Sequence, residues 1–352
     1  MRIGITYDLK GDAIPDADLP DDFQEEFDSP ATIQAVAVAL RGLGHEIAFL
    51  GDGPQLLERL LDDPPEFVFN IAEGQGISRS REARVPAVLE MLGIPYTGSD
   101  PLTLAVTLDK DCAKRLVASA GVAVPRSVVL ESNGSKAEYR DLLHSPSPLL
   151  PFSLSSDQPV IVKPAWEGSS KGIRETSLVD NPDELATAIE AIDANHRQPV
   201  LVEEYIEGHE ITVGVMGSPH EPRILGIMRV LPTNPSSKPF IYSLEVKRDF
   251  ERLVRYECPA RLTGHELEAI EKAAIAAYRV LGCRDIARVD FRVKDGIPYF
   301  LEVNPLPGLN PQSGDIVIMS KLAGWSYEEL IATIVESAVE RNECHPCAPS
   351  RS

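Results

Sequence analysis

The first hundred residues alternate between short apolar runs and longer segments with the spacing of a helix. The apolar runs have the length of strands and occupy residues 2–7, 45–50 and 66–71. The first helical segment, 30–44, opens on Pro30 after Ser29, and the second, 79–93, keeps helical spacing in spite of Pro86. Because strands alternate with helices here, this part predicts a parallel sheet of the α/β type.

The pattern changes after residue 100. One helix is predicted from Asp100 to Ser119, followed by a strand at 126–130 and a surface loop rich in Pro and Ser at 145–159. From there to residue 232, apolar runs of strand length follow one another with turns between them. This succession predicts an antiparallel meander.

The last third of the chain contains two predicted helices and a hairpin. The first helix, 263–281, opens on Thr263 and Glu266, which have the spacing of a capping box, and the last helix, 326–342, opens in the same way. Two strand-like runs between the helices are joined by the turn signal K-D-G at 294–296.

These elements divide the chain into three predicted parts and a tail. With 352 residues, the chain is long enough for two or three domains. We predict an N-terminal α/β domain over 1–104, a central α+β lobe over 105–200, a C-terminal α+β domain over 201–345 and a flexible tail over 346–352.

The bulk composition argues against several classes of partner. The formal net charge is -20 and the pI is about 4.8, which disfavours binding to nucleic acid or to an anionic membrane surface. No apolar run reaches the roughly 18 residues of a membrane span, and the start of the chain lacks the pattern of a signal peptide. Five scattered cysteines, among them Cys344 and Cys347 in a lone C-x-x-C, give no disulfide framework. We therefore expect a cytoplasmic protein.

Residues 8–28, the acidic segment, follow the first predicted strand. The segment holds nine acidic residues against one lysine, which predicts a long loop or lid rather than a core element. It is either a solvated insertion or a part of the ligand-binding side, where the loop after the first strand of an α/β sheet lies.

Three oxygen donors converge on the predicted C-terminal hairpin. Asp290 lies on its first strand, and Glu302 and Asn304 share a face of the second, because residues i and i+2 of a strand point the same way. Carboxylate and amide oxygens suit Mg²⁺, whereas a set without His or Cys is a poor fit for zinc. The alternative is an exposed strand face that carries ordinary charged residues.

Two further stretches suit a nucleotide. An apolar strand ends at Lys163 and is followed by E-G-S-S-K-G at 167–172, whose backbone N–H groups can hold phosphate oxygens. Glu203 and Glu204 end a later strand, and Glu210 follows a glycine. These carboxylates could act as general acid and base, or could accept hydrogen bonds from the amino group and a ribose hydroxyl of a nucleotide.

The order of these motifs resembles that of one family. The chain carries D-K at 109–110, K-P-x-x-E-G-S-S at 163–170, E-E-Y-I-E-G-x-E at 203–210, R-x-D at 288–290 and E-x-N-x-x-P-G at 302–308. Over most of its length it resembles the ATP-grasp superfamily and, within it, the D-alanine–D-alanine ligase family. The resemblance implies an ATP-grasp fold that combines α/β and α+β parts, with an N-terminal Rossmann-like parallel-sheet domain.

The resemblance also implies an activity. A member of this family joins a small-molecule carboxylate to an amine in an ADP-forming reaction through an acylphosphate, and it is commonly a homodimer. A carboxylate does not react with an amine near neutral pH because its leaving group is poor, and the acylphosphate supplies a better one. Mg²⁺ and lysines neutralise the charge that moves with the phosphoryl group, and positive groups stabilise the oxyanion that follows.

The resemblance implies roles for individual residues. It implies phosphate contacts from Lys110 and Lys163, and adenine and ribose contacts from Glu203, Glu204, Ile206 and Glu210. It implies two Mg²⁺ ions, for which Mn²⁺ can substitute, on Asp290, Glu302 and Asn304. The remaining implied roles are γ-phosphate contact for Lys247 with Tyr242 near it, oxyanion stabilisation for Arg288 and the N–H of Gly308, loop closure for Ser169 and acceptor binding for Ser313.

The substrate side departs from the family's pattern. Glu73 stands where the family has a histidine, and Glu26 is the candidate for the glutamate that holds the first substrate's amino group. Arginines occupy positions where the family is acidic or aromatic, namely Arg79, Arg81, Arg84 and Arg248. Arg79, Arg81 and Arg248 either bind an extra acidic group on a substrate or form internal salt bridges with the acidic segment.

Two other functions remain open from the sequence. The protein could be an ATP-grasp ligase for a natural-product or peptide substrate other than D-alanine, or a nucleotide-binding regulator without turnover. Arg288 and both phosphate lysines speak against the regulator, because binding alone does not need an arginine for the oxyanion.

Overall fold

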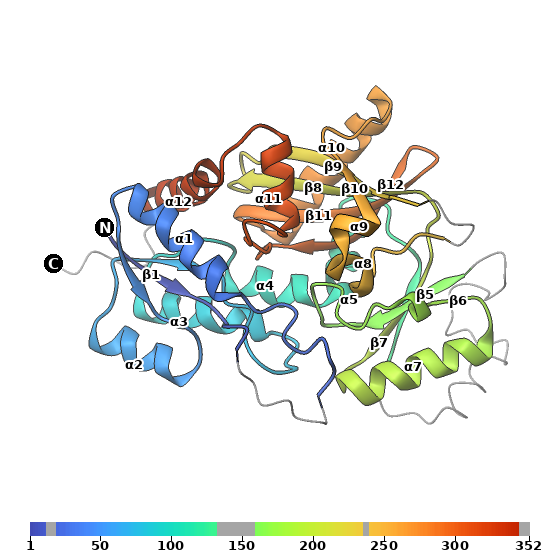
Figure 1. Cartoon of the computed structure of the whole chain (residues 1–352), viewed down its shortest axis with the longest axis horizontal. Helices are drawn as coiled ribbons and strands as arrows, with labels where there is room; N and C mark the ends of the chain where they lie inside the picture. Colours follow the sequence, from blue (N-terminus) through green and yellow to red (C-terminus); the bar gives the residue numbers. More distant parts are fainter. Residues whose placement is uncertain (12–18, 132–158, 235–238, 345–352) are drawn as a thin grey trace.

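The computed structural model describes residues 1–11, 19–131, 159–234 and 239–344. The predicted tail at 346–352, and all but the last residue of the loop predicted at 145–159, lie outside these ranges. Three sheets and the helices that cover them make up the described chain (Figure 1).

The N-terminal part contains the predicted parallel sheet. Its strands are β1 (Arg2–Thr6), β2 (Glu46–Phe49) and β3 (Phe67–Asn70), which pair in the order β2-β1-β3. Its helices are α1 (Pro30–Gly42), α2 (Pro54–Asp62) and α3 (Arg84–Leu92), the last preceded by the 3₁₀ turn η1 (Arg81–Ala83). Helix α2 was not predicted from the sequence. Pro86 lies in the first turn of α3, where a residue without an N–H group costs no helical hydrogen bond.

The single helix predicted over 100–119 is wrong. The structure has α4 (Pro101–Leu108) and α5 (Lys110–Ser119), separated at Asp109, whose backbone is extended. The Asp109 side chain accepts a hydrogen bond from the N–H of Cys112 at 2.9 Å and so caps α5. The break therefore places Lys110 at the first position of a new helix.

The predicted meander is also divided. The middle sheet has the order β4-β7-β5-β6 and consists of β4 (Ser127–Leu130), β5 (Val160–Pro164), β6 (Leu178–Val179) and β7 (Val200–Glu204). The C-terminal sheet has the order β10-β9-β8-β11-β12 and consists of β8 (His209–Gly217), β9 (Arg223–Pro232), β10 (Val254–Glu257), β11 (Asp285–Lys294) and β12 (Ile297–Asn304). Gly208 lies at the crossing between the sheets, where an added Cβ would be 2.1 Å from the carbonyl oxygen of Val293.

The remaining helices cover these sheets. They are α7 (Pro182–His196), α8 (Leu244–Arg248), α9 (Phe250–Leu253), α10 (Gly264–Leu281), α11 (Asp315–Leu322) and α12 (Tyr327–Cys344). The capping box predicted at Thr263 is confirmed, because Thr263 and Glu266 exchange side-chain and backbone hydrogen bonds. None of the described helices is long and apolar enough to cross a membrane.

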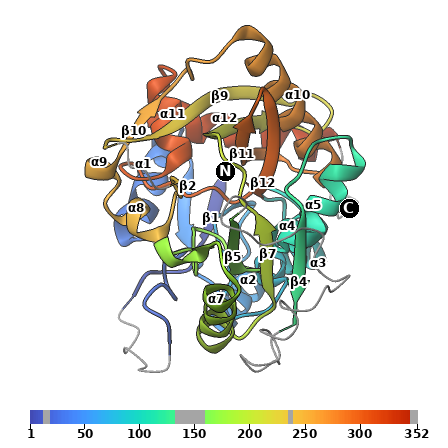
Figure 2. The same ribbon diagram turned by 90° about the vertical axis from the view of Figure 1, so that its right-hand side faces the viewer.

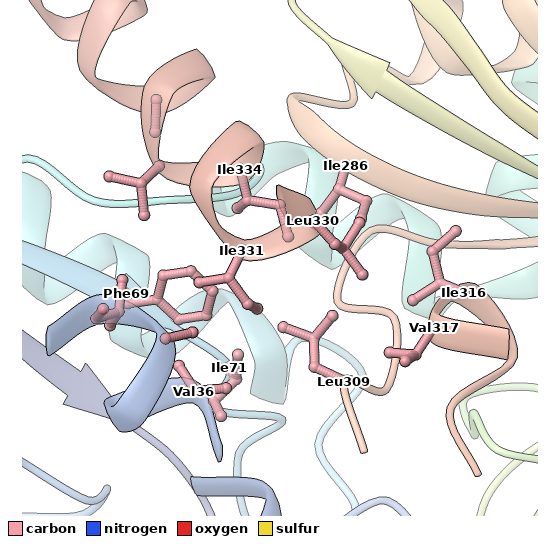
Figure 3. Packing of buried hydrophobic residues seen from close by; sticks show 14 of the residues in the cluster. Val36, Phe69, Ile71, Ile286, Leu309, Ile316, Val317, Leu330, Ile331 and Ile334 are labelled. Atoms are coloured by element: carbon pink, nitrogen blue, oxygen red, sulfur yellow. The ribbon is translucent and has the colours of Figure 1, made fainter. Parts of the chain in front are cut away.

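The N-terminal and C-terminal parts share one apolar core. Val36 of α1 and Phe69 of β3 pack with Leu330 and Ile331 of α12, as Figure 3 shows. Figures 1 and 2 show the five-stranded C-terminal sheet above the four-stranded middle sheet, with α4 and α5 running between the parts. The division into domains stays a prediction, although β7 extends the middle sheet to Glu204.

Candidate active site

Two adjoining pockets contain most of the residues that the motifs single out. The inter-sheet pocket lies between the middle and C-terminal sheets, and its lining includes Lys163, Ser170, Glu203, Glu204, Ile206, Glu210, Tyr242, Lys247, Asp290 and Glu302. The N-terminal pocket includes Glu26, Glu73, Glu82, Lys110, Ser169, Arg288, Glu302, Asn304 and Gly308. Glu302 belongs to both linings, so its carboxylate lies where the two pockets meet.

The predicted oxygen donors lie side by side on the β11–β12 hairpin. Asp290 and Glu302 are paired across the strands, and the Asn304 amide lies 3.4 Å from Asp290. Lys110 lies 3.0 Å from Glu302, and Arg288 lies 2.9 Å from Asp290. Burial would raise the pKa of Glu302, but neighbouring cations hold it far below its usual range, so the group is ionised. Two carboxylates and an amide match the ligands of Mg²⁺.

A buried lysine, Lys114, lies beneath the candidate phosphate contact Lys163 and shares its partner Glu203. The Glu203 carboxylate lies between Lys163, at 2.5 Å, and Lys114, at 2.8 Å. Burial lowers the pKa of Lys114 to about 8, and the attraction of Glu203 limits this shift. Lys114 lies one turn after Lys110 on α5, a helical spacing that could have revealed it.

The two other carboxylates of the inter-sheet pocket have different partners. Glu204 binds the side chain of Arg126 at 2.7 Å. Glu210 forms an ion pair with Arg292 of β11 at 2.7 Å. The Arg292 guanidinium also stacks on the ring of Tyr205, 5.0 Å from its centroid. Ionic and aromatic contacts therefore fix this end of the pocket.

Arg288 connects β11, the strand of Asp290, to α11. Besides Asp290, its guanidinium binds Asp315 at 3.1 Å. The Tyr242 hydroxyl donates to the same Asp315 carboxylate at 3.1 Å, and the ammonium of Lys247 lies 5.2 Å from the centre of the Tyr242 ring. Burial, together with Arg288, lowers the pKa of Lys247. Asp315 was missed from the sequence, since only the tertiary structure brings α11 to this strand.

The loop after β5 contains two successive residues in a left-handed conformation. Ser169 and Ser170 have positive φ angles, 49° and 59°. Ser170 donates a hydrogen bond to the carbonyl of Tyr242 at 3.1 Å, and Gly168 donates its N–H to Glu26 at 2.6 Å. The loop is thus held from both the C-terminal part and the acidic segment.

The described residues of the acidic segment, 8–11 and 19–28, include buried carboxylates, so this part is not simply a solvated insertion. Glu26 is buried and forms ion pairs with Arg81 at 2.9 Å and with Lys171 at 3.3 Å. Both cations also bind Glu167, so two carboxylates and two cations form one closed network. Glu26 lines the N-terminal pocket, which agrees with the second expectation for this segment, and a place on the ligand-binding side stays a prediction.

Arg79, Arg81 and Arg248 of the substrate side form internal ion pairs. Arg248 binds Asp21 and Glu25, each at 2.9 Å, and lies outside the linings of both pockets. Arg79 binds Asp109, and Arg84 is exposed and donates to the carbonyl of Gln75. The contacts of Arg81 and Arg248 agree with salt bridges to the acidic segment, whereas Arg79 pairs with Asp109 outside that segment.

Of the remaining substrate candidates, two line the N-terminal pocket and one lies outside both pockets. Glu73 and Gly308 line the N-terminal pocket. Ser313 is exposed, its N–H donates to the Asn310 side chain at 3.1 Å, and it lies outside both linings. The three cysteines whose side chains are described, Cys112, Cys258 and Cys283, are free, and Cys347 lies outside the described residues.

Comparison with known proteins identifies relatives along nearly the whole chain. Residues 116–336 match the family described as D-ala D-ala ligase C-terminus. The chain is 32% identical over 310 residues to the D-alanine--D-alanine ligase of Halalkalibacterium halodurans, covering 88% of this chain and 93% of that protein. It is 35% identical over 317 residues to the Uncharacterized protein y4sG of Sinorhizobium fredii, covering 87% of each.

Solved structures share the fold. The D-alanine--D-Alanine ligase from Bacillus anthracis complexed with ATP superimposes with a TM-score of 0.69 at 25% identity, covering 97% of this chain and 99% of that chain. The VanG D-Ala:D-Ser ligase from Enterococcus faecalis has a TM-score of 0.66 at 22% identity, covering 96% and 99%, and shows the fold alone. Fold and donor set together define an ATP-grasp ligase. The chain belongs to the D-alanine–D-alanine ligase family.

Proposed function

We propose that this protein uses ATP and Mg²⁺ to join the carboxylate of one amino-acid-like substrate to the amine of a second, with release of ADP and phosphate. The observation that carries the proposal is the position of Glu302 in the linings of both pockets. A phosphoryl group bound on the inter-sheet side would meet a carboxylate bound on the N-terminal side at this residue. The proposal places the reaction in the cytoplasm, and a homodimer stays a prediction.

The residues of the inter-sheet pocket support nucleotide binding. Lys163 and Lys247 line it together with Ile206, whose apolar side chain suits an adenine ring. Glu210 is the candidate for the ribose hydroxyls. In the proposed complex the lysines, with Lys110, neutralise phosphate charge, which is the main requirement of phosphoryl transfer.

Mg²⁺ fits the donors on the hairpin. Asp290, Glu302 and Asn304 would hold it, and when bound it would neutralise the phosphates and polarise the transferring group. Among the described residues no three His, Cys, Asp or Glu side chains form a metal site, so this set depends on the Asn304 amide.

The residues around Glu302 support the second step of the proposed reaction, the attack of the amine on the acylphosphate. After the γ-phosphoryl group moves to the first carboxylate, the amine attacks the acyl carbon and phosphate leaves. Arg288 and the N–H of Gly308 lie in the N-terminal pocket, where they would stabilise the oxyanion that forms. The loop that carries Ser169 would exclude water, which otherwise hydrolyses an acylphosphate.

ADP release tests the proposal. The protein, ATP and Mg²⁺ are incubated with amino acids and small carboxylates, singly and in pairs, and the products are identified by mass spectrometry. We expect ADP only with particular substrates, and an amide product that contains both. Lys247→Met should abolish release, whereas Lys272→Met, an exposed lysine on α10, should not. Tight ATP binding without turnover on any pair would contradict a ligase and favour a regulator.

A further inference from the structure

The glutamate expected to hold the first substrate's amino group is already occupied. One oxygen of Glu26 accepts the N–H of Gly168 at 2.6 Å, and the other lies 2.9 Å from Arg81 and 3.3 Å from Lys171. Burial would raise the pKa of Glu26, but the two cations lower it to about 2. The carboxylate is therefore ionised and its charge is balanced within the protein.

Another carboxylate in the same pocket has no such partner. Glu82, on η1, is only 7% exposed, and it makes no hydrogen bond or ion pair with any described residue. Glu73, in the turn after β3, lines the same pocket and likewise makes neither contact within the described chain. A buried carboxylate without a partner is costly, so it is normally matched by a ligand or kept protonated.

The surrounding charges do not neutralise the carboxylates of Glu82 and Glu73. The charged groups that face Glu82 and Glu73 are Arg81 on the same turn, Lys110 on α5, Glu26 and Asp28 on the acidic segment, and Glu167 after β5. Arg81 is committed to Glu26 and Glu167, and Lys110 to Glu302. Burial raises the pKa of Glu82 to about 8, and burial and the charge of Glu82 raise that of Glu73 well above its usual value.

We propose that Glu82, assisted by Glu73, is the receptor for the ammonium group of the first substrate, in place of Glu26. The inference rests on the proposed ligase function and assigns its substrate class, an amino acid rather than a hydroxy acid. The N-terminal part supplies the two free carboxylates, and the C-terminal part supplies Arg288 and the Gly308 loop. A zwitterion would place its ammonium toward the first and its carboxylate toward the second.

Binding of matched ligand pairs tests this assignment without turnover. Calorimetry is performed with Mg²⁺ and a non-hydrolysable ATP analogue on D-alanine against D-lactate, D-serine against D-glycerate, and L-alanine against L-lactate. We expect at least one amino acid to bind ten-fold or more tightly than its hydroxy analogue. Its binding should release protons, seen as a dependence of the measured heat on the buffer, because Glu82 must ionise to hold the ammonium.

Variants then locate the receptor. Glu82→Gln should reduce the ten-fold preference to nearly one and abolish proton release, while affinity for the ATP analogue is unchanged. Glu82→Asp should restore part of the preference, and Glu73→Gln should weaken it. Glu58→Gln, an exposed carboxylate on α2, is the matched control and should change nothing. Thermal unfolding of each variant verifies that it is folded.

Several results would overturn the assignment. They are equal binding of amino and hydroxy acids, no binding of any amino acid in the panel, a preference that survives in folded Glu82→Gln, or a preference lost only in Glu26→Gln. Failure of the ligase function looks different, because amino acids would then bind with the expected preference but ATP would yield no ADP.

Discussion

The guanidinium of Arg81 lies 2.9 Å from the carboxylate of Glu26, and both side chains are almost fully buried. The pair joins η1 to the acidic segment, and Lys171 and Glu167 extend it to the loop after β5. Three segments that are distant in the sequence are thus connected beneath the N-terminal pocket by one balanced set of charges.

Removal of Arg81 should destabilise the fold strongly. Arg81→Met leaves Glu26 and Glu167 with Lys171 as their remaining ion-pair partner within the described chain. Because breaking a buried ion pair leaves an uncompensated charge, we expect the free energy of unfolding to fall by about 3–5 kcal/mol. Denaturant unfolding measures this change. Arg84→Met, at an exposed arginine, is the control and should cost less than about 0.5 kcal/mol. Equal losses in the two variants would contradict a special role for Arg81.

Arg248 should stabilise closure of the acidic segment and not determine the substrate. Its partners Asp21 and Glu25 are partly exposed, and such pairs contribute about 0–1 kcal/mol and weaken in salt. Arg248→Ala should therefore change KM by roughly five-fold at most, at low salt, and leave the order of preferred substrates unaltered. ADP release across the substrate panel at low and high salt measures both effects.

Arg252→Ala is the matched control for Arg248. Arg252 lies on the neighbouring helix α9 and pairs only locally with Asp249 within the described chain. A new substrate preference in Arg248→Ala, absent from Arg252→Ala, would revive the alternative in which Arg248 binds an acidic group of the substrate.

Loss of an oxygen donor on the hairpin should remove activity without unfolding the protein. Asp290→Asn and Glu302→Gln should each lower the rate of ADP release by roughly 10²-fold or more, since a metal-bound charge is worth several kcal/mol. Excess EDTA should abolish activity in the unmodified protein, and added Mg²⁺ should restore it. Asp295→Asn, in the hairpin turn, is the control, because asparagine tolerates the positive φ of 50° there. Full activity in EDTA would contradict the metal site.

Glu82 should make stability depend on pH. Its folded-state pKa of about 8 exceeds the ordinary value of 4.5, so its proton favours the folded state below pH 4.5 and this advantage declines as pH rises toward 8. Without substrate, Glu82→Gln should have a higher melting temperature than the unmodified protein, by a margin that widens over that range. Glu58→Gln should show no such trend. A constant or reversed margin would contradict a raised pKa for Glu82.

The part of the candidate site proposed for the nucleotide follows from local sequence. Asp290, Glu302 and Asn304 converge because residue spacing on strands fixes the face and a short turn fixes the hairpin. Likewise, Ser29, Thr263 and the turn at 294–296 identified element boundaries from local hydrogen-bonding chemistry. The predicted single helix over 100–119 failed at Asp109, where the side chain caps α5 and the N–H of Lys110 binds the carbonyl of Ala165 in another segment.

The substrate half depends on contacts between distant segments. The sequence showed an excess of acidic residues at 8–28 and of arginines near 80, but it did not show which charges neutralise one another. Burial and proximity decide this, because only the folded chain pairs Arg81 with Glu26 and leaves Glu82 unpaired. The sequence by itself determined the family, most of the strands and the convergence of the oxygen donors on the hairpin. The tertiary structure decided which carboxylates remain free, since charge compensation is a property of positions in space and not of order along the chain.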